Sequence, residues 1–315
     1  MGHFVYMLYK MTSESIVANI SYNSPIKDDL AIGFALFNYT KSKRLVVNYL
    51  YTLEKMKVAN IPTFTIELVI KGERPTIKDA FHVYGDSYLF LKENLFRILE
   101  TKIPEKYTKL LLLDADIIFD NPDWYNMLSQ RLEEFDVVHC FQTAQWLDIT
   151  YTNFIQSEAT TFVLAQDKPN TPLGKTNKSH YHSGFGYAFR RSWYNHAGFV
   201  DKAIIGGGDL LFTYGVFGLK YPRQQGLHIY DSILKEWFLN IQMVRISYLP
   251  VTVYHLFHGG MRKRQYVSRN EIFKDFENIE DAITINEYGV YELIDKSYND
   301  LLLNYFSGRD DDSIY

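Results

Sequence analysis

The sequence has little cysteine and no excess of charge of either sign. Its single cysteine, Cys140, excludes an internal disulfide and argues against a structural zinc site built on cysteines. Because Cys140 follows an apolar run, we expect it to be a buried structural thiol. Lysine and arginine number 33 against 37 aspartates and glutamates, a net charge of -4. A dedicated nucleic-acid binder usually carries a basic excess, so this class is disfavoured.

Long apolar runs are also missing. The longest, such as residues 64–70, fall far short of the ~18 residues of a transmembrane helix. The N-terminal segment MGHFVYMLYKMTSES has neither a cationic start nor a small-residue cleavage site, unlike a secretory signal. We therefore expect a soluble, cytoplasmic protein in a reducing compartment. Aromatic residues are abundant, at 16% of 315 residues, and most of them must belong to the core.

Strand-like and helix-like patterns alternate in the first half of the chain. Strands are expected at 15–23, 63–70, 109–119 and 136–141, and helices at 44–62, 88–101 and about 121–134. This rhythm predicts a mostly parallel sheet covered by helices. The second half is less regular: 142–180 is polar and resembles a long functional loop. Strand-like patterns follow near 245–259, and the tail is helical in pattern over 291–306.

The clearest chemical motif is a run of four leucines followed by Asp114 and Asp116. In an extended segment, side chains two residues apart point to the same face. These two would lie at the carboxyl end of a strand, where open α/β sheets bind their ligands. Neighbouring carboxylates repel each other unless a cation lies between them, and oxygen ligands suit Mg²⁺ or Mn²⁺. The alternative is a polar turn after a buried strand.

Two histidines and a basic run follow the last strand-like pattern. On a strand, His255 and His258 would point to opposite faces, so we do not expect them to bind one metal together. Either histidine taken alone is more simply a hydrogen-bonded core residue, although a neutral imidazole suits a Mn²⁺ shell. Arg262, Lys263 and Arg264 come after a Gly-Gly pair. They could fold over a diphosphate or form a solvated basic loop.

Three glycines precede Asp209 in the segment IIGGGDLLF. Bare backbone would let a sugar ring approach closely, and Asp209 would open a helix. A helix N-cap explains this aspartate equally well, and both roles can coexist because a helix N-terminus keeps a carboxylate ionised. The segment lacks the Lys-Ser/Thr of a phosphate-binding loop and the spacing of a dinucleotide fingerprint. A Ser/His nucleophilic pair at 182–183 lacks the G-x-S-x-G elbow.

Taken in order, these segments resemble the GT-A-fold, DxD-containing nucleotide-sugar-dependent glycosyltransferases. The resemblance is to a bacterial and viral branch with a galactosyltransferase-like C-terminal half. It runs from about residue 61 to the C-terminus. The motifs that carry it are LKEN (91–94), DADIIFDNPDW (114–124), HSGFGYAFRR (182–191), IIGGGD (204–209), HLFHG (255–259), RQY (264–266) and NYFSGRDDD (304–312).

The resemblance implies a GT-A α/β fold with a mostly parallel central sheet flanked by helices. Without an internal repeat or a low-complexity linker, we expect one domain over 1–315. Residues 15–141 would form the nucleotide-binding half, and 142–315 the acceptor-binding half and C-terminal tail. Mn²⁺ or Mg²⁺ would be held by Asp114, Asp116 and His258, which leaves His255 as a buried, hydrogen-bonded histidine.

Further roles follow from the same resemblance. Asp209 would be the general base, although Gly208 stands where the family carries a glutamate, so acceptor recognition would differ. The nucleotide-sugar would be contacted by Asp114, Lys92, Arg262, Arg264 and Tyr266. The acceptor would be contacted by Trp146, His182, Gly207 and Gly208. Residues 259–266 would form a lid that closes over the diphosphate.

The expected activity is metal-dependent transfer of a hexose from a nucleotide-sugar, expected to be a UDP-sugar, to a glycan or other hydroxyl acceptor, with inversion. One alternative is a non-catalytic carbohydrate- or nucleotide-binding module of the same fold. The intact set of Asp114, Asp116, Asp209 and His258 argues against it. Another is a haloacid-dehalogenase-like phosphatase, in which the first DxD aspartate is a nucleophile. Those enzymes usually carry the motif near the N-terminus and need a later acidic pair, whereas IIGGGD supplies one acid.

Overall fold

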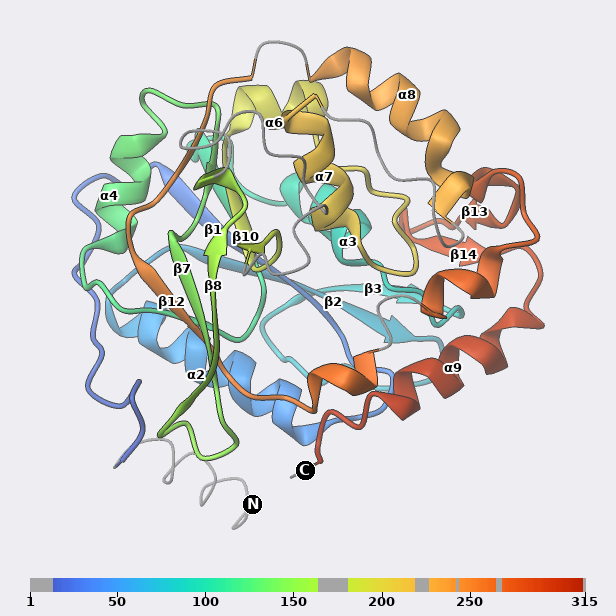
Figure 1. Cartoon of the computed structure of the whole chain (residues 1–315), viewed down its shortest axis with the longest axis horizontal. Helices are drawn as coiled ribbons and strands as arrows, with labels where there is room; N and C mark the ends of the chain where they lie inside the picture. Colours follow the sequence, from blue (N-terminus) through green and yellow to red (C-terminus); the bar gives the residue numbers. More distant parts are fainter. Residues whose placement is uncertain (1–13, 164–180, 219–226, 242–243, 265–267, 314–315) are drawn as a thin grey trace.

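The computed structural model describes residues 14–163, 181–218, 227–241, 244–264 and 268–313. Its main sheet contains β1 (Leu30–Phe37), β2 (Thr63–Ile70), β3 (Phe81–Gly85), β4 (Lys109–Leu113), β6 (Val137–His139), β10 (Gly186–Arg190) and β11 (Ile246–Tyr248). The strand order is β11-β6-β10-β4-β1-β2-β3 (Figure 1). β10 is antiparallel to β4 and to β6, and the other pairs are parallel. The expected mixed α/β fold with a mostly parallel central sheet is confirmed.

Helices cover both faces of this sheet. Leu110 and Leu112 of β4 pack on the side of α3 (Lys92–Glu100), and Leu111 and Leu113 pack on the side of α2 (Lys43–Val58) and α4 (Trp124–Arg131). Because both faces are covered, the four positions of the strand after Lys109 are all apolar. Full burial of one such side chain stabilises the fold by about 1.5–3 kcal/mol.

The remaining helices pack on the α3 side. Each contributes buried apolar side chains to the same cluster as α3. They are α6 (Arg191–Ala197), α7 (Gly208–Val216), α8 (Asp231–Asn240) and α9 (Tyr298–Gly308). Short 3-10 turns connect these elements: η1 (Leu227–Tyr230), η2 (Met261–Arg264), η3 (Ser268–Phe273) and η4 (Ile279–Asp281). No helix within the described ranges is both long and apolar enough to cross a membrane.

A second sheet holds the strands that bring the site together. Its order is β5 (Ile117–Phe119), β12 (Thr252–His255), β7 (Thr143–Leu147), β8 (Phe154–Thr160) and β9 (Tyr181–His182). β5 and β12 are antiparallel, with His255 opposite Ile117, and Leu256 N donates to Asp116 O at 2.9 Å. This pairing places the DAD segment, as it leaves β4, against the strand that carries the histidines. A separate hairpin joins β13 (Ile283–Ile285) and β14 (Tyr291–Leu293).

Three expectations about local structure are wrong. Residues 15–23 form turns rather than a strand, and Lys55 Nζ on α2 donates to Ile20 O at 2.5 Å. Residues 143–160 form the β7–β8 hairpin rather than a loop, because Ala144 and Trp146 alternate toward the core between polar neighbours. The rest of that expected loop, 164–180, lies outside the described residues. Finally, α9 begins at Tyr298, since the residues before it are taken up by β14.

Candidate active site

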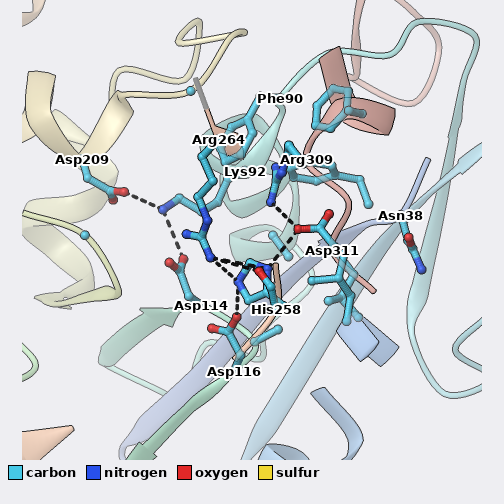
Figure 2. Close-up of a pocket in the computed structure, with 18 of the residues that line it drawn as sticks. Asn38, Phe90, Lys92, Asp114, Asp116, Asp209, His258, Arg264, Arg309 and Asp311 are labelled. Carbon is cyan, nitrogen blue, oxygen red and sulfur yellow. Dashed lines mark hydrogen bonds and ion pairs between the residues drawn. The ribbon is translucent and has the colours of Figure 1, made fainter. Parts of the chain in front are cut away.

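A cavity of about 610 Å³ opens where β1 and β4 end (Figure 2). Its lining includes Asn38 beyond β1, Asp114 beyond β4 and the N-terminal part of α7. This is the edge at which open α/β sheets bind ligands. Most of the residues singled out from the sequence meet here: Lys92, Asp114, Asp116, His182, Gly207, Asp209, His258 and Arg264.

Asp114 and Asp116 take part in two different clusters. The chain turns over residues 114–116 instead of continuing the strand, so the two side chains do not share one set of partners. Asp114 N donates to Phe185 O at 2.7 Å, which keeps this residue at the edge of the main sheet. Asp116 directly precedes β5 in the second sheet. The expected extended backbone is wrong, although both side chains line the same cavity.

Asp116, His255 and His258 form a cluster that fits a divalent cation. Asp116 Oδ2 lies 2.9 Å from His258 Nε2 and 3.5 Å from His255 Nε2, and one ligand atom from each residue lies within 4.8 Å of the others. Ligands about 2.1 Å from a metal, at octahedral or tetrahedral angles, are separated by about 3.0–3.4 Å. Asp116 Oδ1 is buried, and within the described residues it has no hydrogen-bond partner. Nitrogen and carboxylate ligands together suit Mn²⁺.

His255 was expected to point away from His258, and the structure brings the two rings together. Their centroids are 5.1 Å apart. β12 ends at His255, so the alternation of faces along a strand no longer applies at His258. Burial lowers the pKa of His255 well below its usual value, which keeps the ring neutral and able to bind a metal. Burial by itself would raise the pKa of Asp116, but the neighbouring imidazoles hold it well below its usual range.

The second cluster is built around Lys92 at the start of α3. Its Nζ lies 2.7 Å from Asp209 Oδ2, 3.1 Å from Asp114 Oδ1 and 3.9 Å from Glu93 Oε1. Burial would lower the pKa of Lys92, but Asp114 and Asp209 raise it well above its usual value. Burial raises the pKa of Asp114 to about 6 against the opposing effect of Lys92. Lys92, expected to contact the nucleotide, thus links two of the acids.

Glu93 lies beneath the glycine segment that leads into α7. Its side chain is 1% exposed, and burial raises its pKa to about 8. A Cβ atom on Gly208 would be 2.4 Å from Glu93 Cδ, which explains why this position carries glycine. Gly207, with φ +90°, is the residue that caps α7, so Asp209 lies within the first turn of the helix and is not its N-cap.

Other predicted residues are placed differently. Trp146 is 3% exposed, is not part of the cavity lining, and packs its ring 6.0 Å from that of His255. Trp146 therefore packs against one residue of the Asp116–His255–His258 cluster. Gly208 likewise faces Glu93, as described above, and Arg262 lies in η2. Tyr266 lies outside the described residues, so the expected lid over 259–266 stays a prediction. His182 lines the cavity, and its Nδ1 lies 3.5 Å from Glu158 Oε2.

Three cavity residues had no expected role, and His255 was expected only as a buried, hydrogen-bonded histidine. Arg269, Arg309 and Asp311 line the cavity, and His255 belongs to the cation cluster. The motif NYFSGRDDD contained Arg309 and Asp311 but gave no indication of their partners. The HLFH spacing would have indicated His255 if the strand had been ended at His255, three residues before His258. Cys140 is buried, as expected.

No protein-family model matches the chain, and no curated protein matches it. Among solved structures, it is similar to the catalytic domain of Drosophila beta1,4-galactosyltransferase 7 in complex with xylobiose. The identity is 11%, over 87% of this chain and 98% of that chain, with a TM-score of 0.41. It is also similar to a mutant of the same enzyme in complex with manganese, UDP-Gal and xylobiose. The identity there is 13%, over 61% of this chain and 63% of that one, with a TM-score of 0.36.

Proposed function

We propose that the protein is a metal-dependent glycosyltransferase. It would transfer a hexose from a nucleotide-sugar, namely a UDP-sugar, to a glycan or other hydroxyl acceptor, with inversion at the anomeric carbon. The observation that carries the proposal is the presence of two distinct polar clusters in one cavity. One is the Asp116–His255–His258 cluster, which fits a divalent cation, and the other pairs Asp209 with Lys92.

The cation cluster and nearby arginines suit a departing diphosphate. A divalent ion held by Asp116, His255 and His258 would act as a Lewis acid on the leaving group. Arg264 and Arg309 line the same cavity, and Arg264 Nη2 lies 2.9 Å from His258 Nε2. Fixed cations are most effective where negative charge develops during a reaction. The protein would therefore need no acid to protonate the leaving nucleotide.

Asp209 is the proposed general base. It would take the proton from the acceptor hydroxyl as the oxygen attacks the anomeric carbon, while Lys92 holds the carboxylate in place. Gly207, with φ +90°, leaves room for an acceptor, since a Cβ atom on it would have only Arg269 Nη2 nearby, at 3.8 Å, whereas the space beside Gly206 is taken by the Arg269 guanidinium. One carboxylate base is sufficient for single-displacement inversion, and this favours inversion over retention.

The two alternatives fit the cavity less well. In a haloacid-dehalogenase-like phosphatase Asp114 would be the nucleophile, yet its Oδ1 is paired with Lys92 Nζ at 3.1 Å. The cation cluster offers one carboxylate and two imidazoles, rather than several carboxylates. A binding module catalyses no reaction, so a carboxylate base held in place by a buried lysine, as Asp209 is by Lys92, would have no function in it.

A donor-hydrolysis screen tests the function. Purified protein is incubated with a panel of nucleotide-sugars and one phosphomonoester, each with and without Mn²⁺. Slow, Mn²⁺-dependent release of the nucleoside diphosphate from one donor is expected. The matched control is Asp300→Asn on the exposed first turn of α9, which should behave like the unmodified protein. Cleavage of the phosphomonoester alone would indicate a phosphatase, and metal-dependent nucleotide binding without turnover of any donor would indicate a binding module.

A further inference from the structure

The three aspartates of the C-terminal motif GRDDD (308–312) each contact a different part of the protein. The motif follows α9, the red helix along the lower right edge of Figure 1. Asp310 Oδ2 accepts from Lys263 Nζ at 2.6 Å in an exposed ion pair. Asp311 is 6% exposed and lines the cavity. Asp312 contacts the N-terminus of α2, so this short segment connects the residues after α9 to that helix.

Asp312 anchors the segment at the N-terminus of α2. Its Oδ1 accepts from Ser42 Oγ at 2.7 Å and from Arg44 N at 2.9 Å, and its Oδ2 accepts from Lys43 N at 3.1 Å. A carboxylate here satisfies backbone donors that the helix leaves unpaired and interacts favourably with the helix dipole. The anchor fixes the backbone one residue away from Asp311.

Gly259 lets the histidine segment approach this tail. It has φ +68°, and a Cβ atom on it would lie 3.0 Å from Arg309 O and 3.1 Å from Asp310 O. Any other residue would push the two backbones apart. The glycine therefore keeps the neighbouring His258 within reach of Asp311.

His258 is held between two carboxylates. Asp311 Oδ1 lies 3.1 Å from Nδ1, while Asp116 Oδ2 lies 2.9 Å from Nε2 (Figure 2). Arg309 Nη2 also donates to Asp311 Oδ1, at 3.3 Å. An ionised carboxylate can only accept a hydrogen bond, so the contact with Asp311 requires a proton on Nδ1. By the same rule, the contact of Nε2 with Asp116 Oδ2 is a hydrogen bond only while Nε2 carries a proton, and a cation bound between these two atoms would take the place of that proton. Arg264 Nη2 also lies 2.9 Å from Nε2.

We propose that Asp311 is the positioning residue of His258. It holds the proton on Nδ1 and turns the Nε2 lone pair toward Asp116, so that the anchored tail completes the cation site. Carboxylates that accept from a ligating imidazole act in this way in metal proteins generally, by fixing the tautomer and raising the basicity of the ligand. The inference rests on the proposed function, because it requires a divalent cation at Asp116, His255 and His258.

The experiment compares the Mn²⁺ affinity of the whole protein with that of Asp311→Asn and Asp310→Asn, without nucleotide. Free Mn²⁺ is measured by electron paramagnetic resonance during titration. Asp311→Asn should weaken binding by roughly 10–100-fold, because the amide can donate to Nδ1 and move the proton to Nε2. Asp310→Asn, in the same segment but in contact with Lys263, should bind as the unmodified protein does. Thermal unfolding of each variant checks that it is folded.

A second readout reports the tautomer directly. Histidine ¹⁵N NMR of the protein loaded with diamagnetic Zn²⁺ should show His258 protonated at Nδ1 and without a proton at Nε2. Asp311→Asn at the same Zn²⁺ concentration should keep a proton on Nε2. Equal Mn²⁺ affinity in Asp311→Asn and the unmodified protein would overturn the positioning role and leave the proposed function standing. An Nε2-protonated His258 in the Zn²⁺-loaded unmodified protein would do the same, whether or not the variant folds. If the unmodified protein bound no Mn²⁺, the proposed cation site would be wrong. The positioning role of Asp311 would then be wrong as well.

Discussion

The ammonium of Lys92 lies 2.7 Å from the carboxylate of Asp209. Lys92 begins α3 and Asp209 lies in the first turn of α7, so this contact joins two helices on the same side of the sheet. It also places a buried positive charge next to the proposed general base. The orientation of that base therefore depends on a lysine that need not touch the acceptor.

Replacing Lys92 with methionine should destabilise the protein strongly. The change leaves Asp114, Asp209 and Glu93 near one another in a buried site without a cation. Breaking a buried pair in this way costs about 3–5 kcal/mol in the free energy of unfolding, measured by denaturant titration. Lys57→Met, on the exposed side of α2, should cost less than about 0.5 kcal/mol. Equal effects of the two changes would show that the Lys92 pairs do not stabilise the fold.

Asp209→Asn should preserve donor binding and lower turnover. The amide keeps the size of the side chain but removes the basic lone pair, so transfer should fall by roughly 10²–10⁴. Steady-state kinetics with the donor found by the screen measures the effect, and NMR of the product gives its anomeric configuration. Near-normal transfer, or a product with the configuration of the donor, would contradict the single-displacement mechanism.

Asp116→Ala and His255→Ala should both weaken metal-dependent nucleotide binding, because each removes one of the three clustered ligand atoms. In the unmodified protein, UDP with Mn²⁺ should raise the melting temperature by mass action, and UDP alone should not. Calorimetric titration of UDP in the presence of Mn²⁺ gives the affinities. Asp114→Asn serves as the comparison, since Asp114 pairs with Lys92 rather than with the histidines, and it should still bind Mn²⁺. Unchanged affinity for UDP with Mn²⁺ in Asp116→Ala would contradict the proposed cation site.

Gly208→Ala should destabilise the protein through a steric clash. The added methyl would lie 2.4 Å from Glu93 Cδ, and crowding of this kind costs about 1–3 kcal/mol. In the double variant with Glu93→Ala the clash is absent, so the added cost of Gly208→Ala should fall markedly. A double-mutant cycle from denaturant unfolding measures the difference. Additive effects would mean that the two positions do not meet.

Glu93 should make stability depend on pH. Burial raises its pKa from 4.5 to about 8 in the folded protein, so between these values the folded state binds more protons than the unfolded state. The free energy of unfolding therefore falls as pH rises from about 4.5 to 8, and the loss is complete above 8. Glu93→Gln removes this contribution. Its melting temperature relative to the unmodified protein should rise by several degrees between pH 5 and pH 8 in thermal scans, and a constant difference would contradict the assignment.

Local patterns in the sequence predicted much of the main sheet. Residues 63–70 form β2 as expected, the four leucines lie in β4, α4 lies within its expected helix, and α2 begins one residue before the expected helix 44–62. These predictions succeed because apolar periodicity and buried runs are properties of neighbouring residues. Asp116, Asp209 and His258 stand out for the same reason, since each lies next to a recognisable local motif.

The tertiary structure alone decided the partner of each of these side chains. The turn at 114–116 and the antiparallel pairing of β5 with β12 separate Asp116 from Asp114 and bring it to His255. Asp311 reaches His258 because the tail docks on α2. These contacts join segments far apart in the chain, and their formation depends on how the two sheets and the tail pack together. No local pattern encodes that packing, so the sequence by itself determined which residues carry the chemistry, and the fold determined which of them act together.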